Sequence, residues 1–335
     1  MFQRMTLITL LGLFMATTTL AGMPPAEIPA ALGEQVVKLA ADDAAEFDLF
    51  GASVALSGTT ALVGAIFDDD AGSASGSAYV FERDQGGAGN WGQVAKLTAD
   101  NAAEDDQFGR SVALSGTTAL VGAGLDDDAG SDFGSVYVFE RDQGGAGNWG
   151  QVAKITADDA AAGDRFGWSV ALNGTTALVG AYLDGDAGSD FGSVYVFERD
   201  QGEAGNWGQV AKLTADDAAA SDFFGVTVAL SGTTALVGAW RDDDAGSDSG
   251  SAYVFERDQG GAGNWGQVAK ITADDAAAGD EFGTSVALSG TTILVGALGD
   301  DDAGSGSGSA YVFGTGIFAD GFESGDVSAW SSSVP

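Results

Sequence analysis

Short runs of apolar residues alternate with turns rich in glycine and aspartate, and the same order of runs recurs along the chain. Within one copy the pattern predicts four strands, at residues 111–115, 118–123, 135–141 and 150–156, because each run is rich in β-branched and aromatic residues and is bounded by glycine. Phe-Gly pairs 58 residues apart mark the copies, at Phe50, Phe108, Phe166, Phe224 and Phe282. A fixed period of this size predicts stacked supersecondary units.

The second and third strands of each unit are apolar at consecutive positions, such as Tyr137, Val138 and Phe139. Successive residues of a strand point to opposite faces, so both faces of each sheet must be covered. A ring of four-stranded antiparallel blades covers both faces without helices. A β-solenoid is the alternative, but it is built from shorter and more uniform coils. We therefore expect an all-β fold, a β-propeller.

The order of the strands predicts how the ring closes. The outer-strand motif occurs five times, and its first copy, residues 34–40, precedes every first strand. The last unit stops after its third strand, at residues 309–313. The N-terminal strand should therefore complete the last blade, which leaves no open sheet edge. The sequence predicts a five-bladed propeller over residues 33–313, built from five 58-residue repeats and closed by the N-terminal strand.

The repeated Phe-Gly phrase is predicted to be framework. Phe108 should wedge between blades, and Gly109 should let the incoming chain turn. Gly122 and Ala123 are small enough to allow close approach of a neighbouring backbone.

The two ends of the chain differ from the repeats. Residues 1–21 have a charged start, an apolar stretch from Leu7 to Met15 and a small-residue site at Ala21, as a signal peptide has. A membrane anchor is the alternative, but it needs about 20 apolar residues, and Thr17 to Thr19 interrupt the run. We expect a linker at 22–32 and a secreted or cell-surface mature chain that does not insert into a membrane. Residues 314–335 form a Gly/Ser/Asp-rich tail, either a sorting or processing signal or a plain tail.

Charge and composition exclude several classes of function. The 335 residues include 49 acidic and 13 basic side chains, for a net charge of −36. Such a chain repels phosphate backbones and anionic lipid, so we expect no nucleic acid partner. Cysteine and histidine are both absent, which excludes disulfides, thiolate zinc sites and histidine-dependent triads.

Most acidic residues should lie at one end of the blades. In a meander, alternate loops lie at the same end of the sheet, so the loops between second and third strands share an end with the crossovers between units. Carboxylates clustered there are candidate ligands for Ca²⁺, a possible cofactor that takes six to eight oxygen ligands, although the spacing matches no recognised cage. The alternative is that aspartate builds the turns and keeps the surface soluble. The candidate ligands are Asp126, Asp128, Asp184, Asp186, Asp242 and Asp244.

The copies differ from one another mainly at this same end. Aromatic and arginine side chains occur there in some repeats where the other repeats have small or polar residues. Exposed aromatic residues beside carboxylates suit a carbohydrate or protein ligand, whereas neutral drift of loops is the alternative. The candidate ligand-binding residues are Trp168, Tyr182, Trp240, Arg165, Arg241, Phe133 and Phe191.

The phrase FGxSVALSGTTALVGA followed by GSAYVF resembles the FG-GAP repeats of bacterial exported proteins and, more distantly, of integrin α-chain propellers. The resemblance implies a β-propeller with a role in adhesion or extracellular ligand binding. Integrin-type propellers have seven blades, and this chain has five repeats. Many FG-GAP repeats also have a calcium loop of the form DxDxDG between the first two strands. Here that loop is SGTT or NGTT, so calcium at that position is not implied.

We therefore expect an exported, non-catalytic binding or adhesion module with an extracellular glycan or protein as its partner, assisted by a cation if one binds. A carboxylate-dependent, glycan-active enzyme is the first alternative. A catalytic acid pair is normally unique, however, whereas these acids recur in every repeat. A purely structural surface protein is the second alternative.

Overall fold

The computed structural model of the chain describes residues 35–128, 130–185 and 190–314. The chain divides into an N-terminal unit, residues 1–38, and a second unit, residues 39–335, which holds every strand found in the described residues. The predicted signal peptide and linker lie outside the described residues, as does the predicted tail except for Gly314. Within the described ranges, no helix has the length and apolar character needed to span a membrane.

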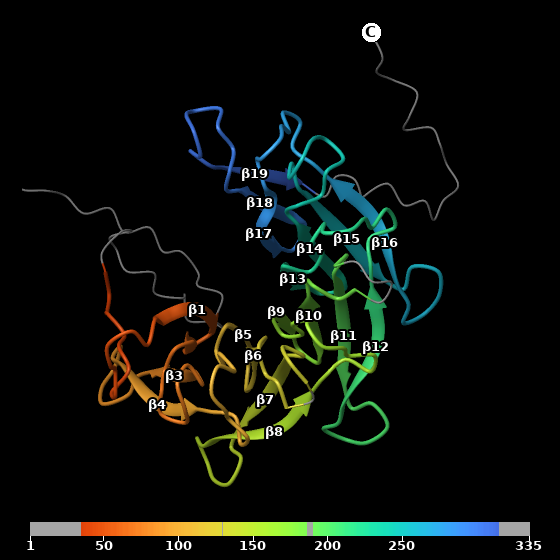
Figure 1. The fold of residues 1–335 in the computed structure, drawn as a ribbon. Coiled ribbons are helices and arrows are strands. Elements are labelled where there is room, and N and C mark those ends of the chain that lie inside the picture. Colours follow the sequence, from red (N-terminus) through yellow and green to blue (C-terminus); the bar gives the residue numbers. More distant parts are fainter. Residues whose placement is uncertain (1–34, 129, 186–189, 315–335) are drawn as a thin grey trace, which may run out of the picture. The chain divides into compact units, whose positions relative to one another are not determined.

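The predicted four-strand unit is present in each repeat (Figure 1). The first blade consists of β1 (Phe50–Ser57), β2 (Thr60–Ala65), β3 (Ser77–Arg83) and β4 (Trp91–Leu97). The second has β5 (Ser111–Ser115), β6 (Thr118–Ala123), β7 (Ser135–Arg141) and β8 (Trp149–Ile155). The third has β9 (Ser169–Asn173), β10 (Thr176–Ala181), β11 (Ser193–Arg199) and β12 (Trp207–Leu213). The fourth has β13 (Thr227–Ser231), β14 (Thr234–Ala239), β15 (Ser251–Arg257) and β16 (Trp265–Ile271), and the last has β17 (Phe282–Ser289), β18 (Thr292–Ala297) and β19 (Ser309–Gly314).

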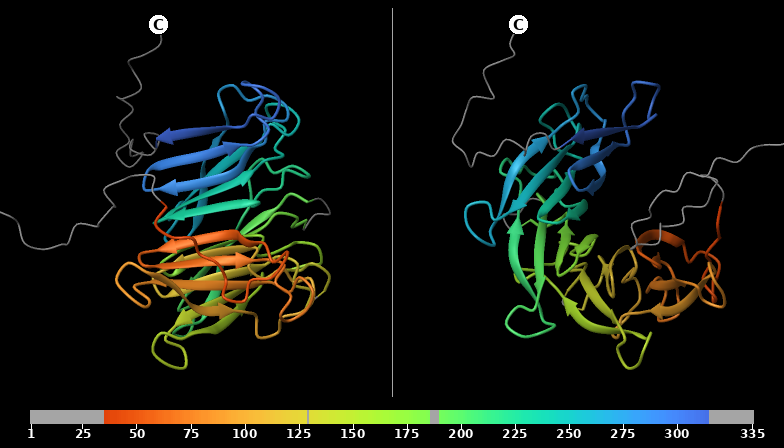
Figure 2. Two further views of the ribbon diagram at one scale, coloured as in Figure 1. Left: turned by 90° about the vertical axis from the view of Figure 1, so that its left-hand side faces the viewer. Right: turned by 180° about the vertical axis from the view of Figure 1, so that it is seen from behind.

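The strands of each blade follow one another in chain order in an antiparallel sheet, which confirms the five-bladed β-propeller (Figure 2). The last blade has three strands, consistent with its completion by the N-terminal segment. Residues 35–40 of that segment are in no strand in this structure, and Gln35 to Lys38 are exposed.

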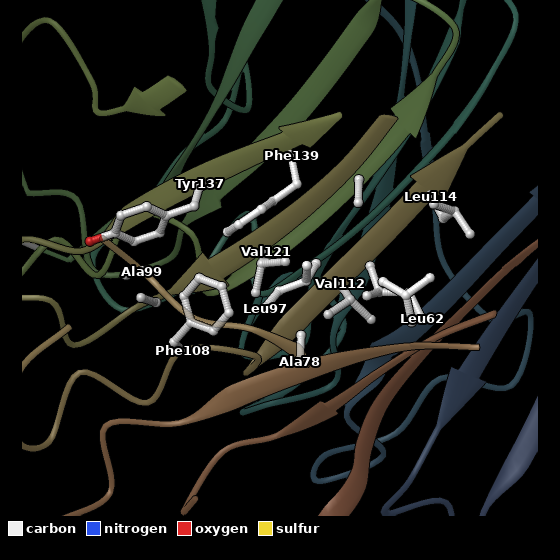
Figure 3. Close-up of a cluster of buried hydrophobic side chains, with 13 residues drawn as sticks. Leu62, Ala78, Leu97, Ala99, Phe108, Val112, Leu114, Val121, Tyr137 and Phe139 are labelled. Carbon is white, nitrogen blue, oxygen red and sulfur yellow. The ribbon is translucent and has the colours of Figure 1, made fainter. Parts of the chain in front are cut away.

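Successive blades are held together by the Phe-Gly phrase, as the sequence predicts. Phe108 is fully buried and lies between the sheet of the first blade and the rings of Tyr137 and Phe139 (Figure 3). Gly109 has a φ of 91°, in the region that favours glycine. At the next interface, a Cβ on Gly122 would lie 2.1 Å from the carbonyl oxygen of Gly167, so only glycine permits this approach.

A hydrogen bond from a side-chain hydroxyl recurs at each of these interfaces. The side chain of Ser111 donates a hydrogen bond of 2.8 Å to the carbonyl oxygen of Gly167 in the next blade. Equivalent bonds run from Ser53, Ser169 and Thr227. Because the backbone groups are paired and the apolar faces are covered, each internal interface is a small hydrophobic core of its own.

The first strand of each blade lies on the inner side and the fourth on the outer side. β5, β9 and β13 contact the first strands of their neighbours, and Figure 1 shows them inside β8, β12 and β16. First strands begin, and second strands end, at the same end of the blades as the loops between second and third strands. We call this end the acidic end. Lys96 bonds both Asp43 of the crossover and Asp68 of the loop, which confirms that these segments share it.

Candidate functional site

Seven side chains from three blades converge on the inner side of the acidic end. Each belongs to one of four places in the repeat: directly before the Phe-Gly pair, directly after it, or one or two residues after the second strand. We call them the aromatic–arginine cluster. They are Arg110, Arg165, Trp168, Tyr182, Phe223, Trp240 and Arg241.

The rings of this cluster form a continuous row across two blades. Trp168 and Tyr182 have ring centroids 4.6 Å apart, and Tyr182 and Phe223 are 5.3 Å apart with nearly perpendicular planes. Phe223 lies 5.9 Å from Trp240. Edge-to-face and tilted pairs at these distances are favourable because the positive edge of one ring meets the negative face of another.

Arginine guanidinium groups cover both ends of the row. The Cζ of Arg110 lies 3.3 Å from the ring centroid of Trp168, and that of Arg165 lies 5.4 Å from the same ring. At the other end, Arg241 lies 4.6 Å from the centroid of Trp240. Each is a cation–π contact, which stabilises by about 0.5–2 kcal/mol according to its exposure.

Two members of the cluster lie on a backbone in the left-handed conformation. Arg165 and Phe223 precede the Phe-Gly pairs and both have a φ of 58°. A side chain other than glycine in this left-handed region costs roughly 1 kcal/mol. The N–H of Arg165 donates to the carbonyl of Asp132, which holds the chain there before Phe166 enters the interface. Leu49, Gln107 and Glu281 have the same conformation in the other repeats, so the turn is part of the framework and only its side chain differs between repeats.

Burial within the cluster is greater than the sequence analysis expected. Trp168, Phe223 and Trp240 are half-buried, and Tyr182 is buried, because the rings cover one another. The hydroxyl of Tyr182 accepts a hydrogen bond of 2.5 Å from Nη1 of Arg165. Burial lowers the pKa of Arg110, and the charge of Arg165 acts in the same direction.

The structure brings together five of the seven predicted ligand-binding residues, all except Phe133 and Phe191. Among the described residues, neither of these two makes a ring contact with the cluster. The ring of Phe133 instead packs over Gly130 of its own loop.

Sequence reasoning missed Phe223 and did not assign Arg110 to the site. Phe223 occupies the same place in the repeat as Arg165, directly before the Phe-Gly pair, where the five copies have Leu49, Gln107, Arg165, Phe223 and Glu281. That variation was the signal that could have found it.

The predicted metal ligands lie in a second set of sites at the acidic end. In the fourth blade, Nζ of Lys270 lies 2.8 Å from Asp242 and 2.5 Å from Asp244 in the loop, and 2.7 Å from Asp217 in the crossover. The hydroxyl of Tyr253 donates to Asp242 at 2.6 Å. Burial opposes the ammonium charge, but bonds to the three carboxylates outweigh it and raise the pKa of Lys270.

The same lysine position is occupied in the other complete blades. Lys96 bonds Asp43, Asp68 and Asp70, and Lys154 bonds Asp126 and Asp128. Lys212 bonds Asp159 and Asp184. The predicted ligand Asp186 lies outside the described residues. An ammonium group therefore lies between the carboxylates to which the sequence analysis assigned a cation.

The last blade has the carboxylates of this site without the lysine of its own outer strand. Asp275, Asp300 and Asp302 each offer an oxygen within 4.8 Å of the others, as do the corresponding groups of the first and fourth blades. Tyr311 donates to Asp300 at 2.6 Å, as Tyr253 does to Asp242. Three carboxylates supply only part of the six to eight oxygens that Ca²⁺ takes, and water would have to supply the rest.

Comparisons with known proteins identify the repeat. No curated protein matches the chain. The family model described as FG-GAP repeat matches residues 34–81, 91–139, 149–197, 207–255 and 265–313, which is more than half of the chain. Each matched segment begins in an outer strand, or in the N-terminal segment for the first, and ends in the third strand of the following blade. The chain therefore belongs to the FG-GAP repeat family.

Proposed function

We propose that this chain is an exported, non-catalytic binding module that presents the aromatic–arginine cluster to an extracellular glycan or protein. The supporting observation is convergence. Seven of the residues that differ between otherwise nearly identical repeats meet in one row of rings and guanidinium groups at the inner side of the acidic end. Drift that is independent in each loop would not be expected to produce a contiguous row.

The carboxylates support a binding role over the enzymatic alternative. Glycoside hydrolysis needs one pair of acids with distinct environments. Here the acids recur in every blade, and in the four complete blades a lysine bonds the buried loop aspartate while the tyrosine of the third strand donates to it, as Lys270 and Tyr253 do for Asp242. Groups repeated in this way are suited to stabilising the loops.

A binding array of glycans and extracellular-matrix proteins tests the proposal. A buried aromatic anchor contributes about 2 kcal/mol or more to binding, so we expect Trp168→Ala and Trp240→Ala each to weaken affinity roughly thirtyfold. Trp91→Ala, which removes a repeat tryptophan from the first blade at β4, is the matched control. If both cluster variants bind every ligand of the wild-type protein with unchanged affinity, the cluster is not the binding site.

Cation assistance is part of the proposal. Carboxylates repel one another in the folded acidic end more than in the unfolded chain, so a bound cation favours folding. Millimolar calcium should raise the melting temperature more than sodium chloride at the same ionic strength. Equal stabilisation by the two salts would reduce the effect to screening.

A further inference from the structure

The basic residues of this protein are few, and most of them are paired with carboxylates. Lysines of the outer strands bond the loop aspartates, as described above. At the ends of the third strands, Arg141, Arg199 and Arg257 pair with Glu82, Glu140 and Glu198 of the preceding blades. With 49 acidic residues for 13 basic ones, a basic side chain without a carboxylate is an exception.

Arg110 and Arg165 are such exceptions. Among the described residues, no carboxylate oxygen lies within 4.0 Å of a guanidinium nitrogen of either arginine, which is the limit for an ion pair. Both guanidinium groups instead lie beside the indole of Trp168. Arg241, at the other end of the row, differs because its Nε is 3.6 Å from Asp248.

The hydrogen-bonding capacity of the two guanidinium groups is largely unused. Arg110 donates from Nη1 to Gln107 at 3.2 Å, and Arg165 donates from Nη1 to Tyr182. The Nε atoms of both arginines are buried and have no partner among the described residues. A guanidinium has five N–H donors, and the donors of this pair that are neither buried nor already bonded, those of Nη2 above all, are available to a ligand.

Holding these two charges together is unfavourable in the free protein. Burial and mutual repulsion act against Arg110, as its lowered pKa indicates. The left-handed backbone of Arg165 is shared by Leu49, Gln107, Phe223 and Glu281 at the same place in the other repeats, so it belongs to the turn and not to the site. Buried polar groups without partners are typical of binding sites, where a ligand supplies the missing interactions.

We propose that Arg110 and Arg165 together bind the carboxylate of a uronic acid in an extracellular glycan, with a neighbouring neutral sugar against Phe223 and Trp240. The inference rests on the proposed binding function and specifies its ligand. A carboxylate presents two oxygens that match the two parallel donors of a guanidinium. Half-buried aromatic rings beside it provide the apolar surface on which a sugar ring packs.

The net charge of the chain limits how many negative charges the ligand can carry. With −36 on the chain, a polyanion such as a sulfated glycan or a nucleic acid is repelled along its length. An otherwise neutral oligosaccharide that carries a single uronate delivers one carboxylate to the pair with much less of that repulsion. This favours sparsely charged glycans over densely charged ones.

Titration calorimetry with matched sugars tests the proposal. The probes are a xylo-oligosaccharide with one glucuronic acid and a galactan oligosaccharide with one galacturonic acid, each compared with its neutral counterpart. We expect at least one uronate probe to bind about tenfold more tightly than its counterpart, and Arg110→Gln and Arg165→Gln each to remove that advantage. Arg83→Gln is the control, because Arg83 is exposed on the hairpin of the first blade. Melting temperatures establish that the variants fold.

The outcomes separate this inference from the proposed function. Equal affinity for charged and neutral probes, with loss on Trp168→Ala, overturns the carboxylate site and leaves the binding function in place. Arginine-dependent binding of an acidic peptide but of neither uronate probe overturns the glycan class. If no ligand in the array binds more weakly to Trp168→Ala or Trp240→Ala, the proposed function itself is wrong.

Discussion

The fourth and the last blade have nearly the same sequence and differ in what surrounds them. Leu236 and Val254 of the fourth blade are fully buried, whereas their counterparts Leu294 and Val312 are 41% and 69% exposed. A Cβ on Gly238 would meet the carbonyl oxygen of Gly283 at 2.1 Å, while at Gly296 it would meet only Ser285 of its own blade. Gly296 and Ser285 line an open pocket with Thr284, Ala297, Leu298, Gly308, Ser309 and Ala310.

Burial in this fold is supplied by the neighbouring blades: Leu236 and Val254 are covered by the following blade, and Val112 and Leu114 by the preceding one. Val54 and Leu56 of the first blade are about 70% exposed, and Val112 and Leu114, one repeat later, are buried. In the described part of the chain, the Phe50-Gly51 pair of the first blade therefore lies in no groove of another blade, and the groove at Gly296 of the last blade holds no Phe-Gly pair. Neighbour contacts dominate stability in repeat proteins, so the two blades should become equivalent once the ring is closed.

Deletion of residues 33–38 should have the largest effect on this comparison. It removes the segment predicted to complete the last blade and leaves the edge of β19 unpaired. Ala41, which packs against the first blade, is retained. We expect a loss of about 4 kcal/mol, or roughly 10 °C in melting temperature, together with aggregation. A cooperative melt at the wild-type temperature would show that this segment does not complete the last blade.

The lysine sites provide a matched pair of substitutions. Lys270→Met leaves the carboxylates of the fourth blade uncompensated, and loss of one partner of a buried ion pair costs about 3 kcal/mol. Lys38 precedes Lys96 by one repeat length, so closure predicts that it serves the carboxylates Asp275, Asp300 and Asp302. We therefore expect Lys38→Met to lower the unfolding free energy, measured in urea, by a similar amount. A neutral result at Lys38 alongside a large one at Lys270 would leave the last site without a lysine.

The glycines of the groove test whether the blades are equivalent at the inner side. Gly238→Ala should cost about 2 kcal/mol, because the added carbon overlaps the backbone of the next blade. Gly296 has no positive φ, so an alanine there is not strained by its own backbone. If Phe50 and Gly51 enter the last groove in solution, Gly296→Ala should cost as much as Gly238→Ala. A much smaller loss would mean that the groove stays open.

Some features of both blades could be predicted from the sequence, and others could not. The strands, the five blades and the framework role of Phe108 follow from local patterns, because each repeat contains its own sheet and its own Phe-Gly pair that packs against the preceding blade. The lysine between the carboxylates was not predicted, although Lys154 recurs in every copy and pairs across the sheet with Tyr137. Only the register, which shifts between Val138 and Phe139, places its ammonium group beside Asp126. Phe223 was missed because its position depends on a left-handed backbone that composition does not reveal.

The smallest effect we predict concerns the carboxyl of Asp222 in the crossover that enters the fourth blade. Burial raises its pKa from 3.8 to about 6, the charges of Asp242 and Asp243 add to this, and a hydrogen bond from the N–H of Ala219 opposes it. A pKa raised by folding means that the folded state binds the proton more tightly than the unfolded state does. The stabilisation is therefore complete below about pH 4 and is lost as the pH rises through 6.

Asp222→Asn should remove this dependence, because the amide oxygen still accepts the bond from Ala219. We expect the variant to gain on the order of 1 kcal/mol over the wild type at pH 7, and to have a flatter profile of melting temperature between pH 4 and 7. Asp258→Asn is the control, since that carboxylate accepts a bond from Gly263 in an exposed hairpin. Parallel profiles for wild type and Asp222→Asn would show that folding does not raise the pKa of this carboxyl.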